Sequence, residues 1–199
     1  PVSDGTLLAT NLFLPDREGP WPTVLTRTPY GKGGSGDSSG HFFAARGYVY
    51  VVQDVRGRFA SGGEFYTARA EGKDGFDVQT WCAAQKWCDG SIGTMGGSYG
   101  GFAAWQPAPY GCPAVKSMLT GITGANFYDV VYQQGALHLA EGTLWTLAIT
   151  DPPGFDASSR DAAATLRLLP LSTLDENATG RQIPMLRDVF AHPARDEYW

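Results

Sequence analysis

The run Val49-Tyr50-Val51-Val52 restricts the fold of this 199-residue chain more than any other feature, because its apolar residues do not alternate with polar ones. A strand that is apolar at every position is typical of a sheet covered on both faces. Helical stretches over residues 39–46 and 71–85 separate the strand-like runs. The strands are expected over residues 7–14, 22–28, 49–53, 91–96 and 114–121. This alternation predicts the α/β class, with a mostly parallel sheet and helices on both faces.

Glycines and carboxylates add detail to this expected sheet. The 26 glycines gather mainly between residues 31 and 101, where we expect them to mark tight turns between buried strands. Glu71 and Asp74 stand at the start of the second expected helix, where the positive end of the helix dipole favours carboxylates.

The pattern becomes helical after about Gly124, and no strand is expected there. Apolar residues recur at spacings of three and four over residues 137–148, and Asp151-Pro152-Pro153 should end that helix. A second helix is expected from Ser158 or Ser159 to Leu169, and a third over residues 184–190. We therefore expect two domains, an α/β core over residues 1–123 and a helical layer over residues 124–199.

Composition excludes several classes of protein. The chain has 15 Lys and Arg against 20 Asp and Glu, a net charge of −5 and no basic run, which argues against a partner that is a nucleic acid or an anionic membrane. Its apolar runs are shorter than the roughly 20 residues of a membrane helix. Three cysteines, Cys82, Cys88 and Cys112, are too few and too unevenly spaced for a disulfide framework or a zinc site.

The two ends of the sequence predict a piece of a longer polypeptide. Pro1 is preceded by neither an initiator Met nor a signal peptide, and the cytoplasm is the favoured compartment on that ground. Tyr198-Trp199 closes the sequence with an aromatic pair that is normally packed.

Gly96-Gly97-Ser98-Tyr99-Gly100 carries the strongest chemical signal, a G-x-S-x-G pattern between an expected strand and an expected short helix over residues 101–106. This context predicts a nucleophile elbow, in which Ser98 is presented at a sharp turn and flanking glycines let neighbouring segments approach. The backbone N–H of Tyr99 would then donate to a developing oxyanion. The alternative is a glycine-rich turn in which Ser98 only caps the helix.

Two loops after strands are further candidates. The first contains Tyr30, whose hydroxyl could supply the second oxyanion donor, although an ordinary strand-to-loop turn has the same appearance. The second contains Asp54, Arg56 and Arg58, and we interpret it as an ion-paired loop that holds the edge of the active-site face.

Several segments in the same order resemble the family of cocaine esterase and X-Pro dipeptidyl-peptidase, and they cover residues 4 to about 123. They are Asp4-Gly5, Leu8-Ala9-Thr10, Leu12-Phe13-Leu14-Pro15, Arg27-Thr28-Pro29-Tyr30, Gln53-Asp54-Val55-Arg56-Gly57-Arg58, Ser61-Gly62-Gly63-Glu64-Phe65, Trp87-Cys88-Asp89-Gly90-Ser91-Ile92-Gly93 and Gly97-Ser98-Tyr99. The helical part resembles the family more loosely, through Gly135-Ala136-Leu137, Trp145, His192-Pro193, Asp196 and Tyr198-Trp199.

The resemblance implies an α/β-hydrolase with an inserted helical cap and, in complete members, a C-terminal jelly-roll domain. It implies a serine hydrolase that forms an acyl-enzyme without a metal or an organic cofactor. Ser98 matches the nucleophile, and the Tyr99 N–H and the Tyr30 hydroxyl match the oxyanion donors. Trp145 matches a cap aromatic that faces the acyl pocket, although a core residue of an amphipathic helix is the simpler interpretation.

A serine nucleophile also needs a base and an acid, which follow it in this fold. His41 precedes the elbow, His138 is expected in the middle of a cap helix, and His192 matches the end of the family's cap. We therefore expect the catalytic Asp and His beyond Trp199. Pro107 and Pro109 should end the helix after Ser98 at about Gln106, where the family's helix continues.

The sequence thus predicts a serine hydrolase that cleaves an acyl ester or amide through an acyl-enzyme on Ser98, with a small-molecule acyl ester favoured and a homodimer left open as its assembly. An X-Pro dipeptidyl-peptidase, with a peptide substrate, and a cephalosporin-type acylase are the alternatives within the class. A catalytically incomplete fragment or a non-enzymatic hydrolase-fold module is the alternative from another class.

Overall fold

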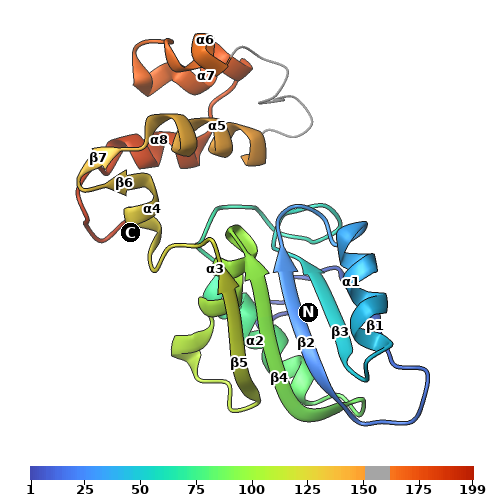
Figure 1. The fold of residues 1–199 in the computed structure, drawn as a ribbon. Helices are drawn as coiled ribbons and strands as arrows, with labels where there is room; N and C mark the ends of the chain where they lie inside the picture. The colour runs from blue at the N-terminus through green and yellow to red at the C-terminus, as the bar shows by residue number, and fades with distance from the viewer. Residues whose placement is uncertain (151–161) are drawn as a thin grey trace. The chain divides into compact units, whose positions relative to one another are not determined.

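The computed structural model describes residues 1–150 and 162–199, which form two compact units, Pro1–Thr123 and Gly124–Trp199 (Figure 1). The first unit contains a five-stranded sheet in the order β1-β3-β2-β4-β5. β1 is antiparallel to β3, and the other neighbouring strands are parallel. The expected mostly parallel sheet and its five strands are confirmed. The strands are β1 (Thr10–Phe13), β2 (Trp21–Thr28), β3 (Val49–Asp54), β4 (Cys88–Gly97) and β5 (Val115–Gly121).

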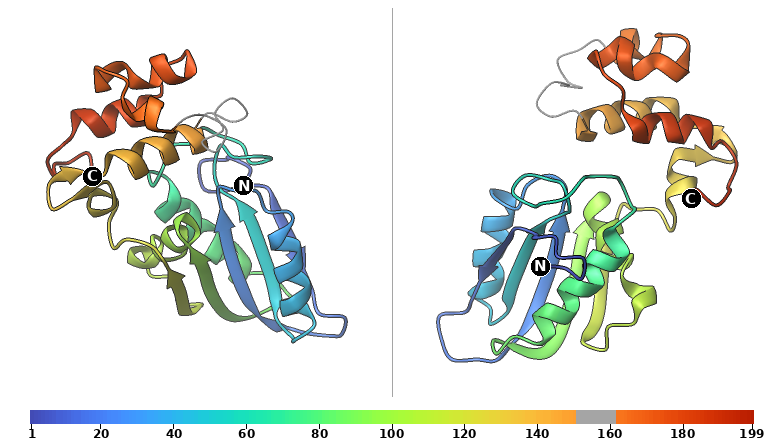
Figure 2. Two further views of the ribbon diagram at one scale, coloured as in Figure 1. Left: turned by 45° about the horizontal axis from the view of Figure 1, so that its top comes forward. Right: turned by 180° about the vertical axis from the view of Figure 1, so that it is seen from behind.

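Helices cover both faces of β3, as its apolar run predicts. The structure forms α1 (Ser35–Ala44), α2 (Glu71–Ala83) and α3 (Tyr99–Trp105), and Figure 2 shows α1 and α2 on opposite faces of the sheet. Val49 and Val51 join a core with side chains of α2, whereas the ring of Tyr50 stacks on Phe43 of α1 at 5.4 Å between centroids. Every residue of β3 is buried for this reason.

Two glycines inside the expected helices allow close packing. Gly40 lies inside α1, and a Cβ there would be 2.4 Å from the ring of Phe13. Gly75 lies inside α2, and a Cβ there would be 2.3 Å from the ring of Pro107. These glycines let the helices approach their neighbours closely. α1 begins at Ser35, four residues before the expected start, and includes Gly36 in its first turn.

β1 is shorter than expected because the residues before it bond to a loop. The Gly62 N–H donates to the Leu7 carbonyl at 2.8 Å, and the Ala9 N–H donates to Ser61 Oγ at 2.8 Å. Ladder pairing with β3 begins only at Thr10.

The second unit is mainly helical. Helix α5 confirms most of the expected 137–148 helix and α8 confirms the third expected helix, while the residues expected to end α5 and to start the next helix lie outside the described residues. The absence of strands was a wrong expectation, because β6 and β7 form a small antiparallel hairpin. The elements are α4 (Phe127–Val131), β6 (Tyr132–Gln133), β7 (Ala136–Leu137), α5 (Leu139–Thr150), α6 (Ala162–Leu166), α7 (Leu174–Thr179) and α8 (Pro184–Ala191).

Two groups of apolar side chains hold the second unit together. Leu147 of α5 is fully buried against Leu174 of α7 and Leu186 of α8. Trp199 packs against the ring of Tyr128 at 5.3 Å, and its indole N–H donates to the His192 carbonyl at 2.9 Å. None of the helices in the described ranges has the length and hydropathy needed to cross a membrane.

A buried carboxylate in this unit makes stability depend on pH. Asp175 accepts hydrogen bonds from the Ile183 N–H at 2.6 Å and from Arg187 Nε at 2.8 Å. Burial opposes its ionisation, but the hydrogen bonds from Arg187 and from the backbone of Ile183 and Glu176 outweigh burial and lower the pKa of Asp175. We expect Asp175→Asn to lower the free energy of unfolding by about 2 kcal/mol at pH 7 in urea titrations.

The difference in unfolding free energy between the wild type and Asp175→Asn should depend on pH. The pKa of Asp175 is lower in the folded chain than in the unfolded chain, where it is near 4. The ionised carboxylate therefore stabilises the folded state fully above about pH 4, and this stabilisation is lost as the pH falls through the folded-state pKa. The wild type and Asp175→Asn should therefore converge in acid. Glu176→Gln is the control, because Glu176 also pairs with Arg187, at 3.0 Å, but its side chain is 40% exposed. Equal effects of the two variants at pH 7 would contradict the prediction.

Candidate active site

Ser98 stands between β4 and α3 in a strained backbone conformation. Its φ is 52° and its ψ is −125°, and non-glycine residues adopt such values only where the surrounding structure enforces them. The Ser98 N–H donates to the Gly121 carbonyl at 2.9 Å, and its carbonyl accepts from the Phe102 N–H at 3.0 Å. The side chain is exposed and makes no capping hydrogen bond to α3. The backbone turns as sharply as a nucleophile elbow requires, and the Ser98 side chain does not cap α3.

Glycines around Ser98 make this turn sterically accessible. A Cβ on Gly96 would be 2.3 Å from both C and O of Gly100, so the strand and the helix could not approach. A Cβ on Gly101 would be 2.9 Å from the Gly96 carbonyl oxygen. Pro107 follows the end of α3, which terminates at Trp105 as its prolines predict.

Tyr99 follows Ser98 and is buried, with a side chain fixed by Glu71. The Tyr99 hydroxyl donates to Glu71 Oε1 at 2.6 Å, and Glu71 Oε2 lies 2.9 Å from Nη1 of Arg27. Burial, and then the charge of Glu71, raise the pKa of Tyr99 well above its usual range, so the hydroxyl remains a donor. Glu71 thus does more than complement a helix dipole, which is the only role that the sequence indicated for it.

Tyr30 lies in the loop after β2, and its side chain is 52% exposed. Leu25 of β2 pairs with Thr94 of β4, so the two strands, which end at Thr28 and Gly97, finish at the same level. The loop that carries Tyr30 and the elbow that carries Ser98 therefore leave neighbouring parallel strands at the same edge of the sheet.

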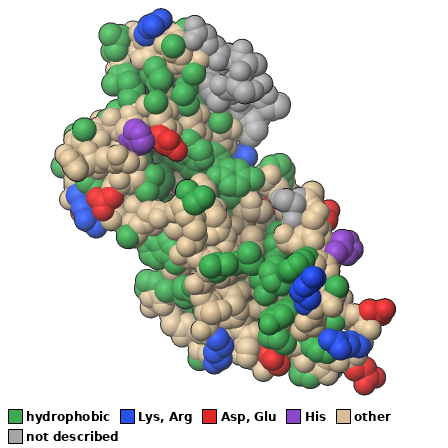
Figure 3. All heavy atoms as spheres, viewed as in Figure 1, with side chains coloured by type: hydrophobic (Ala, Val, Ile, Leu, Met, Phe, Trp, Pro, Cys, Tyr) green, Lys and Arg blue, Asp and Glu red, His purple; other side chains and the backbone are tan. Residues whose placement is uncertain are grey.

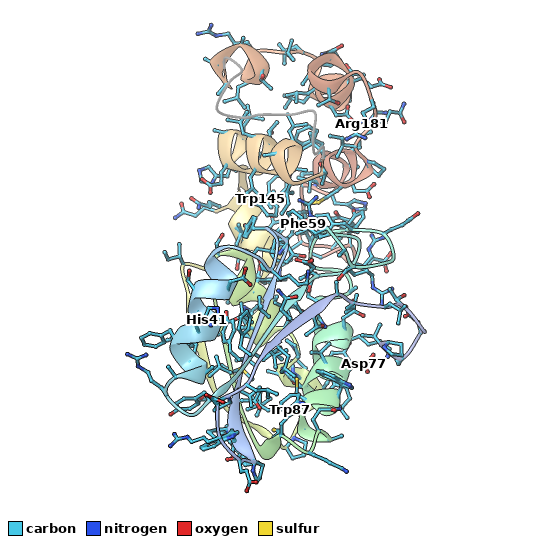
Figure 4. The ribbon with its side chains drawn as sticks, turned by 90° about the vertical axis from the view of Figure 1, so that its right-hand side faces the viewer. His41, Phe59, Asp77, Trp87, Trp145 and Arg181 are labelled. Atoms are coloured by element: carbon cyan, nitrogen blue, oxygen red, sulfur yellow. The ribbon has the colours of Figure 1, made fainter. Side chains whose placement is uncertain are left out.

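The segment after β3 holds the Tyr30 loop in place. Asp54 Oδ1 accepts from the Lys32 N–H at 2.7 Å, and Arg58 Nε donates to the Pro29 carbonyl at 3.0 Å. The guanidinium of Arg58 also lies over the ring of Phe59, at 5.3 Å from its centroid. Figure 4 shows Phe59 at this end of the sheet and Trp87 at the opposite end.

The loop with Asp54 and two arginines is ion-paired, as interpreted from the sequence, although its partners lie elsewhere in the chain. Arg56 forms two hydrogen bonds to Asp74, at 2.9 and 2.7 Å, and a further ion pair to Asp4 at 2.9 Å. Hydrogen bonds from the Thr6 backbone and then from Arg56 lower the pKa of Asp4 well below its usual range.

The three histidines lie outside the elbow segment in the sequence. His41 is on α1 with its ring 5.3 Å from that of Phe13. His138 is exposed and precedes α5, so its expected place in the middle of a helix is wrong; its N–H donates to the Val131 carbonyl at 2.7 Å beside the hairpin. His192 Nδ1 lies 2.8 Å from Asp196 Oδ2 in the second unit.

Trp145, the remaining predicted site residue, and the three cysteines lie apart from the elbow segment in the sequence. Trp145 lies on α5 of the second unit and is partly buried (Figure 4). The three cysteines are free thiols, and burial raises the pKa of Cys82, which makes that thiol a poor nucleophile. Within the described residues, no group of three or more His, Cys, Asp or Glu side chains could hold a metal ion.

Comparison with solved structures gives the fold class. An aminopeptidase from a marine sediment archaeon (Thaumarchaeota archaeon) superposes on 100% of this chain with a TM-score of 0.78 at 22% identity, and the match covers 38% of that structure. A CocE/NonD family hydrolase of Staphylococcus aureus superposes on 100% of the chain with a TM-score of 0.75 at 22% identity, and the match covers 36% of it. The chain has the α/β-hydrolase fold that the resemblance implied.

The family follows from the sequence as a whole. Residues 4–199 match the X-Pro dipeptidyl-peptidase (S15) family, and the chain belongs to it. A cocaine esterase of Rhodococcus sp. (strain MB1 Bresler) is 34% identical over 223 residues, which cover 100% of this chain and 38% of the esterase. The chain thus spans well under half the length of this relative, and the relatives are serine hydrolases of the esterase and peptidase types.

Proposed function

We propose that this chain belongs to a serine hydrolase that cleaves a small acyl ester through an acyl-enzyme on Ser98. The observation that carries the proposal is the strained backbone of Ser98, which presents an exposed hydroxyl at the end of β4. Membership of a family that contains esterases and peptidases supports it.

The chemistry assigns each group one task. Ser98 Oγ attacks the carbonyl carbon while its proton passes to a base, and the carbonyl oxygen becomes an oxyanion. The Tyr99 N–H and the Tyr30 hydroxyl donate hydrogen bonds to that oxyanion. Collapse of the intermediate expels the alcohol, which takes the proton from the base, and water then releases the acyl group from Ser98.

The domain roles are part of the same proposal. Residues 1–123 form the N-terminal part of the hydrolase core, residues 124–199 form the helical cap, and the base, its acid, the remaining strands and a jelly-roll domain follow Trp199. β5 is the last strand of the sheet in the described residues, so its outer backbone edge can pair with a further strand. Two apolar side chains at this strand are also exposed, Leu119 in β5 at 67% and Ile122 just after it at 96%. Figure 3 shows hydrophobic side chains on the face of the first unit that carries β4 and β5.

The charges near the elbow favour an ester over a peptide with a free amine. A substrate amine needs an available carboxylate, and the buried carboxylates of the first unit have cationic partners: Asp54 with Lys32, Glu71 with Arg27, and Asp74 with Arg56. We propose that Trp145 contacts the acyl group. The X-Pro dipeptidyl-peptidase and the cephalosporin-type acylase remain the alternatives within the class.

The alternative from another class is a hydrolase-fold module without catalysis. The observation in its favour is that the first unit has no histidine after Ser98, where the base follows the nucleophile in this fold. If the native product ended at Trp199, the open edge of β5 would predict self-association.

Labelling with a fluorophosphonate separates these candidates. The intact mass of the purified full-length protein is measured before and after exposure, and peptide mapping locates the adduct. One adduct on Ser98 supports the serine hydrolase. An unlabelled Ser98 in a folded protein would support the module without catalysis.

A further inference from the structure

A buried polar network links the elements that carry the two proposed oxyanion donors. Arg27 belongs to β2, Glu71 to α2 and Tyr99 to α3, and none of the three is more than 5% exposed. Arg27 Nη1 donates to the Glu71 carbonyl oxygen at 3.0 Å as well as pairing with its carboxylate. Arg27 Nε donates to Gln53 of β3 at 3.0 Å, so the network joins two strands and two helices.

Stability alone explains this network poorly. A buried ion pair gains Coulomb energy but loses the hydration of both charges, and well-packed apolar residues in its place are often as stable or more so. Such a pair does fix relative positions, because its partners have few alternative arrangements in a buried site. The pair is therefore best explained by the chain segments whose relative positions it fixes.

The pair joins the chain segments from which the two proposed donors extend. Arg27 precedes Tyr30 by three residues on the same strand end, and Tyr99 directly follows Ser98. A Cβ on Gly100 would be 3.4 Å from the Arg27 carbonyl oxygen, so the two backbones also lie close together at this point. Oxyanion donors act only within about 2.7–3.1 Å of the developing charge, and small displacements reduce the rate strongly.

The Tyr99 side chain connects the turn at Ser98 to this ion pair. The strained φ of Ser98 favours relaxation of the turn, and such relaxation would rotate the peptide plane that carries the Tyr99 N–H. The hydrogen bond from the Tyr99 hydroxyl to Glu71 fixes the residue on the far side of that peptide. The protonated hydroxyl described above keeps this contact intact at ordinary pH.

We propose that the Arg27–Glu71 pair, acting through the Tyr99 hydroxyl, positions the oxyanion-binding site, which makes Glu71 and Arg27 positioning residues of the reaction. The inference rests on the proposed function. It assigns a role to the side chain of Tyr99, whereas the sequence predicted a role only for the backbone N–H of this residue.

Tyr99→Phe in the full-length protein tests the inference, because it removes the hydroxyl and leaves the backbone N–H. The rates are measured with a p-nitrophenyl ester and divided by the amount of Ser98 that a fluorophosphonate labels. We expect kcat to fall about tenfold or more, KM to change less than about twofold, and the inhibition constant of an arylboronic acid to rise as kcat/KM falls.

Tyr132→Phe is the matched control, because the buried Tyr132 hydroxyl donates to the Val189 carbonyl at 3.0 Å in the second unit. It should lower the melting temperature and leave kcat per labelled serine within about twofold. If Tyr99→Phe does not fold, Glu71→Gln carries the test with an expected fall in kcat of about threefold to tenfold, because the amide still accepts from Tyr99 but no longer pairs with Arg27.

Two results would overturn the inference in distinguishable ways. A folded Tyr99→Phe or Glu71→Gln protein with unchanged kcat and boronate affinity, and only a lower melting temperature, would make the network structural while the proposed function stands. A folded wild type in which the fluorophosphonate leaves Ser98 unlabelled would remove the proposed function and this inference with it.

Discussion

Replacement of Ser98 by alanine in the full-length protein is expected to abolish ester turnover, with a fall in kcat of about 10⁴-fold or more. The attacking oxygen is lost, and only the oxyanion donors and substrate binding remain to accelerate attack by water. Initial rates with a p-nitrophenyl ester measure the loss. The protein should stay folded, because the Ser98 contacts that shape the turn come from its backbone, to Gly121 and Phe102.

Two further variants make this result specific. Ser117→Ala, at an exposed position of β5, should keep kcat within about twofold. Ser98→Gly should be as inactive as Ser98→Ala but more stable by about 1 kcal/mol, since glycine adopts a φ of 52° without strain. Full turnover by Ser98→Ala would remove Ser98 as the nucleophile, whatever its backbone geometry.

The sequence is informative where the signal is local. The unalternating run from Val49 to Val52 is enough to predict a strand with helices on both faces, because burial on both faces leaves no position for a polar side chain. The elbow is also predictable, since one pentapeptide contains both the strained residue and the glycines that permit it. The same locality explains why α5 and α8 could be expected from apolar spacing and from Pro184.

The missed features depend on contacts between distant residues. Glu71 and Tyr99 are 28 positions apart, and Glu71 and Arg27 are 44 apart, so no local pattern reveals that they meet. A charged residue inside a strand that should be buried, Arg27, was the available signal for a buried partner. The start of α1 is harder to predict because Gly36 lies in its first turn, and glycine is as common in turns as at points of close approach.

The β6–β7 hairpin was missed for another reason. Its strands have two residues each, which is too short for any alternation to be visible. The turn between them uses positive φ at Gln134, 53°, and at Gly135, 81°. Only the glycine is a conventional turn signal, so the segment looked like a continuation of the helical layer.

Gly96→Ala is expected to be strongly destabilising, because the added methyl group would clash with backbone atoms. The new Cβ would lie 2.3 Å from both C and O of Gly100, and these atoms belong to the backbone of α3. The clash cannot be relieved by a side-chain rotation, so β4 and α3 must separate and the strained turn at Ser98 must open. We expect the free energy of unfolding to fall by about 3 kcal/mol or more in urea titrations.

Gly97→Ala provides the control at the next position along the same strand. Its added Cβ would be 3.8 Å from the Gly121 carbonyl oxygen, an ordinary contact, and Gly97 does not have a positive φ. We expect this variant to change the free energy of unfolding by less than about 1 kcal/mol. Because both variants add one methyl group to one strand, a difference between them isolates the contact between β4 and α3. Equal stabilities of the two variants would mean that this contact does not set the shape of the elbow.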